Sequence, residues 1–160
     1  MDLKEIMAAF AAESGIESLE ADENGAYHLS IDEMSVSFME NPETMRLVTW
    51  AEVCDVPPEG RERLYRVMME AMFMGSATGG AMFSVEPGGE TIFLQRVDSL
   101  AVMDFAGFKM MLELFVNVLE EWRKLVSDFR DITPELDSIQ QEPVEESRQF
   151  GLGAGGFMQV

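Results

Sequence analysis

The most regular pattern in the chain lies between residues 105 and 129, where large apolar residues recur at intervals of three and four. This spacing places them on one side of an α-helix of about seven turns, with Asp104 as a suitable N-cap. A coiled coil has a similar spacing, but large aromatic residues fit poorly into a narrow two-stranded seam. The pattern therefore favours a long helix lying along a sheet. The residues are Phe105, Phe108, Leu112, Phe115, Leu119, Trp122, Val126 and Phe129.

Three segments before this helix have the alternating pattern of β-strands. Turn signals at Asn24-Gly25 and Asn41-Pro42 bound the first two, at residues 27–31 and 34–38. The third, residues 44–54, carries β-forming residues at both sets of alternate positions, which predicts a central strand covered on both sides. The apolar positions are Tyr27, Leu29, Ile31, Met34, Val36 and Phe38 in the first two strands, and Met45, Leu47, Val53, Val48, Trp50 and Cys54 in the third.

Two other segments have helical spacing. The first runs from Leu3 to about Ser14, where Gly15 ends it. The second runs from Arg61 to Met74 and carries two apolar stripes, which require two neighbours. We expect one stripe to cover the sheet and the other to bind a second copy of the chain. The stripes are Leu64, Val67, Met68, Ala71 and Met72, and Tyr65, Met69 and Phe73.

The stretch AMFMGSATGGAMF, residues 71–83, raises the question of phosphate binding. Gly75 and Gly80 have the spacing of a Walker loop, but Ala81 and Met82 stand where Lys and Ser or Thr would be needed. The preceding residues also predict a helix, whereas a phosphate loop follows a strand. We interpret residues 75–80 as a flexible loop that leads into a hairpin formed by residues 81–86 and 91–97.

The order of these elements predicts an α+β fold in which three helices pack on an antiparallel sheet of about five strands (α-β-β-β-α-β-β-α). A chain of 160 residues suits a single domain, which we place at residues 1–130. Residues 131–160 are rich in Pro, Glu, Gln and Gly. Such a composition predicts a flexible acidic and Gly-rich C-terminal tail.

Charge limits the partners of the chain. Its 30 acidic and 11 basic residues give a net charge of -19, which repels nucleic acid and anionic membranes and favours basic partners. No stretch approaches the roughly 20 apolar residues that span a bilayer, and the N-terminus lacks an export leader. The single Cys54 suits a reducing cytoplasm. The 14 Met residues suit both irregular cores and adaptable binding surfaces.

No group of residues predicts catalysis or a metal site. The stretch EADENG matches the start of a calcium loop, but Ile31 occupies the place of the required bidentate acid. His28 has no partner in a recognisable motif, and the acid pairs Glu120-Glu121 and Glu145-Glu146 are more simply solvated. We therefore expect a protein that is not an enzyme and uses neither a cofactor nor a metal.

The order of elements, the size, the acidity and several local stretches resemble the type III secretion chaperones that serve individual effectors, the family that includes the Tir chaperone. The resemblance covers about residues 1 to 130 and is a matter of pattern. Phe73-Met74 departs from it, because many members have a small residue followed by Asn there. The stretches are LKEIMAAFAAESG, GAYHLSIDEMSVSFME, LVTWAEVCDVPP, LYRVMMEAMFM, AMFSVEPGGETIFLQRV and FAGFKMMLELFVNVLEEW.

The resemblance implies a homodimer in the bacterial cytoplasm that binds the unfolded chaperone-binding region of a secreted effector and keeps it soluble and competent for export. A YbjN-like protein of similar fold, acting as a protein-binding adaptor outside secretion, is the alternative. By position, the family's effector contacts fall on Leu3, Ile6, Met7, Phe10, Val36 and Phe38, and its dimer contacts on Leu64, Val67, Met68, Met72 and Met82.

Overall fold

The computed structural model describes residues 1–140, and side chains for residues 1–129. Its five-stranded antiparallel sheet has the order β1-β2-β3-β5-β4. Three α-helices and two 3₁₀ turns complete the described part, which confirms the predicted α+β class. The elements are α1 (Leu3–Ser14), β1 (Tyr27–Ile31), β2 (Met34–Asn41), β3 (Arg46–Asp55), α2 (Arg61–Met72), η1 (Phe73–Gly75), β4 (Met82–Val85), β5 (Thr91–Ser99), η2 (Leu100–Val102) and α3 (Phe105–Gln140).

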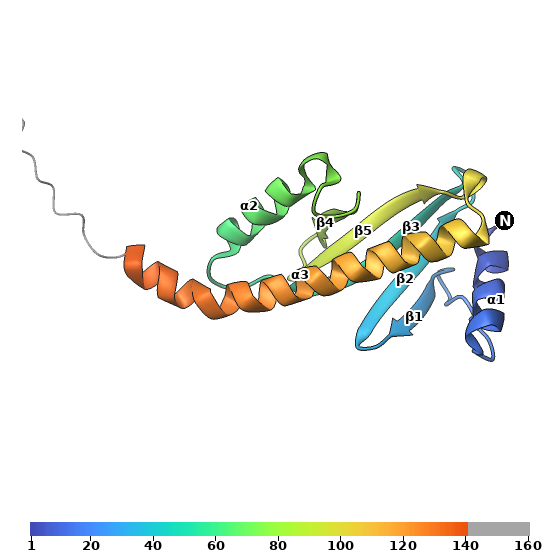
Figure 1. Cartoon of the computed structure of the whole chain (residues 1–160), viewed down its shortest axis with the longest axis horizontal. Helices are drawn as coiled ribbons and strands as arrows, with labels where there is room; N and C mark the ends of the chain where they lie inside the picture. Colours follow the sequence, from blue (N-terminus) through green and yellow to red (C-terminus); the bar gives the residue numbers. More distant parts are fainter. Residues whose placement is uncertain (141–160) are drawn as a thin grey trace, which may run out of the picture.

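Helix α3 lies along one face of the sheet, and α1 packs beside its N-terminal end (Figure 1). The Phe108 ring is at the centre of this layer. It lies 6.1 Å from the ring of Phe10 in α1 and 5.5 Å from the ring of Phe38 in β2. The spacing predicted for α3 is confirmed, since its positions 108, 112, 115, 119, 122 and 126 are buried, while Phe105 and Phe129 at the two ends of the pattern are half-buried.

Helices α1 and α3 begin with capping residues. Asp2 and Glu5 form a reciprocal capping box at the start of α1, and Gly15 ends that helix with a left-handed φ of 71°. Asp104 caps α3, because its Oδ1 accepts a hydrogen bond of 2.7 Å from the N–H of Gly107.

Helix α3 continues further than the sequence pattern predicts. We expected it to end near Arg130, where the composition changes, but it runs through Pro134 to Gln140. A helix that has already formed gains one hydrogen bond for each residue added other than proline, which favours extension over a few less suitable residues. Residues 141–160, most of the predicted tail, lie outside the described residues.

The central strand β3 is covered on one face only. Leu47, Thr49 and Ala51 are buried against the helix layer, whereas Val48 and Trp50 on the opposite face are half-buried. The prediction that β3 is covered on both sides is therefore wrong for this chain taken alone. The sequence of β3 has apolar residues on both faces, and this pattern does not show that helices pack on only one side of the sheet.

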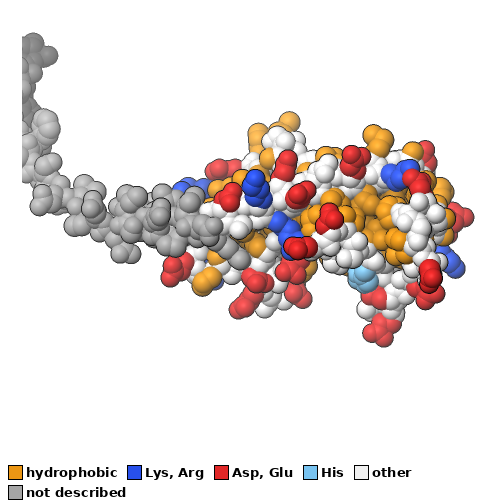
Figure 2. Space-filling view, turned by 60° about the horizontal axis from the view of Figure 1, so that its bottom comes forward, with side chains coloured by type: hydrophobic (Ala, Val, Ile, Leu, Met, Phe, Trp, Pro, Cys, Tyr) orange, Lys and Arg blue, Asp and Glu red, His pale blue; other side chains and the backbone are white. Residues whose placement is uncertain are grey.

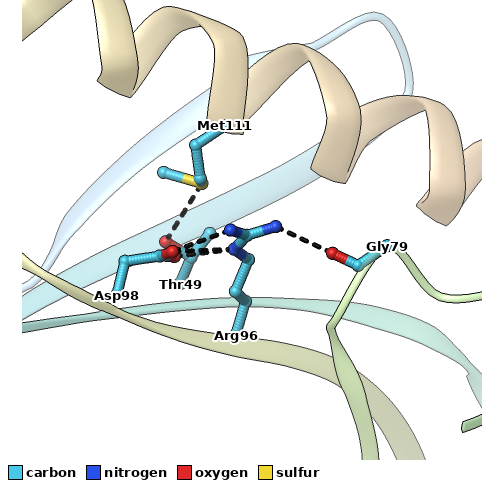
Figure 3. Close-up of polar contacts among 5 residues, drawn as sticks. All are labelled: Thr49, Gly79, Arg96, Asp98 and Met111. Atoms are coloured by element: carbon cyan, nitrogen blue, oxygen red, sulfur yellow. Dashed lines mark hydrogen bonds and ion pairs between the residues drawn. The ribbon is translucent and has the colours of Figure 1, made fainter. Parts of the chain in front are cut away.

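The glycine-rich loop is anchored by side chains from two elements. Arg96 in β5 donates a hydrogen bond of 2.9 Å to the carbonyl of Gly79 and forms an ion pair of 2.8 Å with Asp98 (Figure 3). Trp122 in α3 donates to the carbonyl of Ala77 at 3.0 Å. Gly79 has a φ of 58°, and a Cβ there would lie 3.2 Å from the side chain of Leu114. The loop that we predicted to be flexible is thus tied to α3 and β5.

We expect Arg96→Met to lower the free energy of unfolding by about 2 kcal/mol, because it breaks two charge-assisted contacts and leaves Asp98 partly buried without its cation. Amide exchange at Gly79 and Gly80 should increase more than exchange in α1. Arg66→Met, a loss of the same charge from an exposed position on α2, is the control. Equal stability of the two variants in urea would show that the ion pair does not hold the loop.

Candidate protein-binding site

The single histidine has a polar environment that the sequence did not indicate. His28 Nδ1 lies 2.8 Å from Ser37 Oγ, and its Nε2 lies 3.2 Å from Asp22 Oδ2. This set has the composition of a hydrolase triad. However, Ser37 lies within β2 between β1 and β3, where ladder hydrogen bonds occupy the neighbouring N–H groups that would have to form an oxyanion hole. The three side chains are better explained as a link between the 22–26 turn and the sheet.

Asp22 stabilises that turn through its charge. Hydrogen bonds from the N–H of Ala26, then from His28, lower the pKa of the Asp22 carboxyl from its ordinary value. A group whose pKa is lowered by folding stabilises the folded state above its unfolded pKa, and this contribution is lost as the pH falls through the folded pKa. We therefore expect Asp22→Ala to lower the melting temperature at neutral pH, and the difference from the wild type to shrink below about pH 3.9. Thermal unfolding across this pH range measures the difference, with Glu23→Ala as the control. If the Asp22 carboxylate had no such role, the difference in melting temperature between Asp22→Ala and the wild type would not change with pH.

The six residues predicted to contact an effector come together where α1, β2 and α3 meet. Five of them, Leu3, Ile6, Met7, Val36 and Phe38, are buried in the core. Phe10 is the exception, since its side chain is half-buried against Phe108. No observation tests their role in binding, which remains a prediction, but the five buried positions shape this end of the molecule from below its surface.

An apolar surface lies around these positions. We define the α1-end surface by Phe10, Leu19 and Phe105, which are half-buried, and Ile16, which is 39% exposed. Figure 2 shows hydrophobic side chains gathered on one face near the end of the molecule opposite the C-terminal end of α3, the end at which α1 lies in Figure 1. A contact of 2.8 Å between Lys109 and Glu13 joins α3 to α1 here.

The second candidate surface is on α2. Among the predicted dimer contacts, Leu64 and Met68 are buried in the core of their own chain, Met72 is half-buried, and Val67 and Met82 are 41% and 44% exposed. The second apolar stripe is less covered still, with Met69 68% and Phe73 75% exposed. One stripe of α2 thus partly joins the core, and the other is mostly exposed apart from the half-buried Tyr65.

An apolar groove of about 380 Å³ runs between α2 and the strands beside it. Its floor includes Ile92, and Met72 contributes a sulfur that accepts from the N–H of Phe83 at 3.1 Å. Its lining consists of Tyr65, Met68, Met69, Met72, Phe83, Ser84, Val85 and Ile92. Because methionine side chains adapt their shape easily, such a groove suits a protein partner.

Two exposed residues of this region were not among the predicted contacts. Met74 is 86% exposed and has a left-handed φ of 59°, while Val85 at the edge of the sheet is 41% exposed. A left-handed conformation is easier for Asn, which is what the resembled family often has at this position, than for Met. The departure from the family pattern was the only signal in the sequence that pointed to Met74.

Neither a metal centre nor a membrane span stands out in the described part of the chain. The described side chains include no group of three or more His, Cys, Asp or Glu residues placed to hold a metal ion. The helices of this part include none that is both long and apolar enough to cross a bilayer.

A one-sided sheet with apolar surfaces on two of its helices defines a protein-binding module. The chain matches the model of the Tir chaperone protein (CesT) family over residues 5–123. It therefore belongs to this family of secretion chaperones. The match supports the type III secretion resemblance and gives no support to the YbjN-like alternative.

Solved structures agree with this fold. The chain is similar to one in the crystal structure of the ExsC-ExsE complex, with 24% identity and a TM-score of 0.64 over 78% of this chain and 96% of that chain. A chain of the HopA1-SchA chaperone-effector complex gives 11% identity and a TM-score of 0.62, covering 76% of this chain and 92% of that one. A chain from the structure of the Yersinia pestis type III secretion chaperone SycH in complex with a fragment of YscM2 has 18% identity and a TM-score of 0.57. The match covers 74% of this chain and 98% of that one. A comparison with curated sequences gave no significant match.

Proposed function

We propose that this protein is a type III secretion chaperone that acts in the bacterial cytoplasm, where it binds the unfolded chaperone-binding region of one effector and keeps it soluble for export. Family membership over residues 5–123 supports the class of function. The observation that carries the proposal is the amount of uncovered apolar surface, at the α1 end and along α2, on a chain with an otherwise acidic exterior. Exposed apolar patches of this kind mark sites of interaction with other proteins.

The working form is a homodimer joined through α2. The exposed stripe of Met69 and Phe73, with Val67 and Met82 beside it, supplies apolar side chains that a second copy would cover. A two-fold interface suits a helix of this kind, because the same stripe is then buried on both copies. A dimer would also double the surface available to an extended effector segment.

The α1-end surface is the proposed effector contact. An unfolded segment gains binding energy by placing apolar side chains against exposed apolar residues, and Phe10 is the predicted contact that is open to such a partner. The net charge of -19 attracts segments rich in Lys and Arg and speeds their association. The other five predicted effector contacts are buried in the core, where they hold Phe10 and its neighbours in position.

Co-expression with the secreted proteins encoded beside its gene tests the function. We expect one of them to be soluble only with this chain and to copurify with it through its N-terminal region. Phe10→Ser should weaken that complex about tenfold or more, because truncation of a central aromatic contact costs upwards of 1 kcal/mol. Leu125→Ser, which removes an exposed apolar residue from the far half of α3, should not.

Circular dichroism must show that both variants fold. If none of the neighbouring secreted proteins depends on this chain for solubility, the proposed function is wrong. If a complex forms and Phe10→Ser leaves it unchanged, the function stands and the α1-end surface is wrong.

A further inference from the structure

Strand β5 is longer than the edge strand that pairs with it. Residues Met82–Val85 of β4 pair with Ile92 to Gln95, so the last four residues of β5, Arg96 to Ser99, have β3 on one side and, within the described residues, no strand on the other. In an antiparallel sheet, alternate residues direct their N–H and C=O groups to opposite sides. About half of the backbone groups over these four residues therefore face an open edge.

An apolar groove of about 380 Å³ runs beside this open edge. One wall is the N-terminal half of α3, with Met110 72% and Leu114 44% exposed, and Val102 of η2 at one end is 87% exposed. The Arg96–Asp98 ion pair lies in the floor (Figure 3). The full lining is Arg96, Asp98, Ser99, Val102, Met103, Gly107, Met110, Met111 and Leu114.

The chain's own glycine loop is prevented from filling the edge. The hydrogen bond from Trp122 to the Ala77 carbonyl joins this loop to α3, and the bond from Arg96 to the Gly79 carbonyl joins it to β5. Gly79 also lies so close to Leu114 of α3 that a Cβ would not fit without a shift. Strand β4 then begins only opposite Gln95. The open edge is thus built into the fold by an anchored loop. It is also separate from the α1-end surface, since β1 and α1 lie on the other side of α3 from the end of β5 (Figure 1).

We infer that this edge and groove accept an extended segment of an unfolded partner protein, which pairs with residues 96–99 as a continuation of the line of β4. Backbone pairing at a strand edge, with alternate side chains entering an adjacent apolar pocket, is a known mode of peptide recognition. An unpaired edge needs a partner with free N–H and C=O groups in extended form, which selects an unfolded segment over a helix or a small molecule.

The partner chemistry follows from the lining and the charge. Alternate residues of the segment must be apolar to occupy the groove between Met110 and Val102. The remaining residues should include Lys or Arg, because the chain carries a net charge of -19, and the exposed acids Asp104 and Glu113 adjoin two lining residues. This inference rests on the proposed function and adds a second contact, on the opposite side of α3, for the same class of unfolded partner.

The test uses the full chain and a short synthetic peptide that alternates Val or Leu with Ser or Lys. Amide hydrogen exchange should slow at residues 96–99 when this peptide binds, and a peptide of equal composition with its apolar residues grouped together should not have this effect. The double variant Val102→Ser/Met110→Ser should bind about tenfold more weakly, since it removes two exposed apolar contacts. The control Leu125→Ser should bind as the wild type does.

Three results would overturn the inference. The first is amide exchange at residues 96–99 that does not change when the peptide binds, or exchange that slows in β1 and not at residues 96–99. The second is protection without peptide that disappears when residues 141–160 are removed, because the chain's own C-terminal segment would then occupy the edge. The third is protection that rises with protein concentration, which would assign the edge to a second copy. None of them affects capture of an effector in co-expression, so the proposed function is judged separately.

Discussion

Replacing Phe108 by alanine should lower the free energy of unfolding by about 3–5 kcal/mol, a large part of the stability of a small domain. Phe108 is fully buried and its ring contacts those of Phe10 and Phe38, so its loss opens a cavity where α1, β2 and α3 meet. Those neighbours belong to three different elements, which limits their ability to close the gap. Urea denaturation monitored by circular dichroism gives the measurement.

Met110→Ala is the matched control for this substitution. It lies two residues further along α3 but is 72% exposed, so its loss should change the stability by less than about 0.5 kcal/mol. Similar values for Phe108→Ala and Met110→Ala would contradict the packing of α3 on the sheet described above.

The double variant Met69→Glu/Phe73→Glu should convert the proposed dimer to monomers. Both side chains are more than two-thirds exposed in the single chain, and burial of such residues is worth about 1.5–3 kcal/mol each. The substitutions remove that gain and place like charges from two copies close together, which should raise the dimer dissociation constant about a thousandfold or more. Sedimentation velocity over a range of concentrations measures the change.

Ile16→Glu/Val102→Glu adds the same charge at exposed apolar positions near the α1 end, away from α2, and should leave the dimer intact. A wild-type chain that sediments as a monomer at micromolar concentration would contradict the dimer itself. A double variant on α2 that still forms dimers would show that they form through another surface.

Regular patterns in the sequence were sufficient to predict the fold. The spacing from Phe105 to Phe129 can be satisfied only by a helix with one buried side, and the alternation in residues 27–38 only by strands. Local signals also gave correct ends, such as Gly15 after α1 and Asp104 before α3. These features depend on residues close together in the chain, which a single sequence contains.

Exposure within an apolar stripe could not be predicted in the same way. Leu64 and Met69 are both apolar and belong to different stripes of one helix, yet the first is 1% and the second 68% exposed. The difference depends on where α2 lies against β4 and α3, which spacing along the chain does not encode. For the same reason, five of the six predicted effector contacts are buried in the core.

The anchored loop and the open edge of β5 depend on contacts between distant residues. Arg96 is 17 positions from Gly79, and Trp122 is 45 from Ala77. The glycines correctly predicted a loop after α2, but no local signal indicated which side chains would hold it. That arrangement decides where β4 begins, and therefore how much of β5 is left without a neighbour.

The central claim is that this chain holds part of a secreted effector in an unfolded form. The most direct test is amide hydrogen exchange on the N-terminal region of an effector, measured in its purified complex with this protein, together with the mass of the complex by light scattering. We predict two copies of this chain per effector, slowed exchange confined to short extended stretches, and fast exchange in the rest of the bound region. An effector region that is folded and uniformly protected in the complex, or that exchanges equally fast with and without this protein, would contradict the claim.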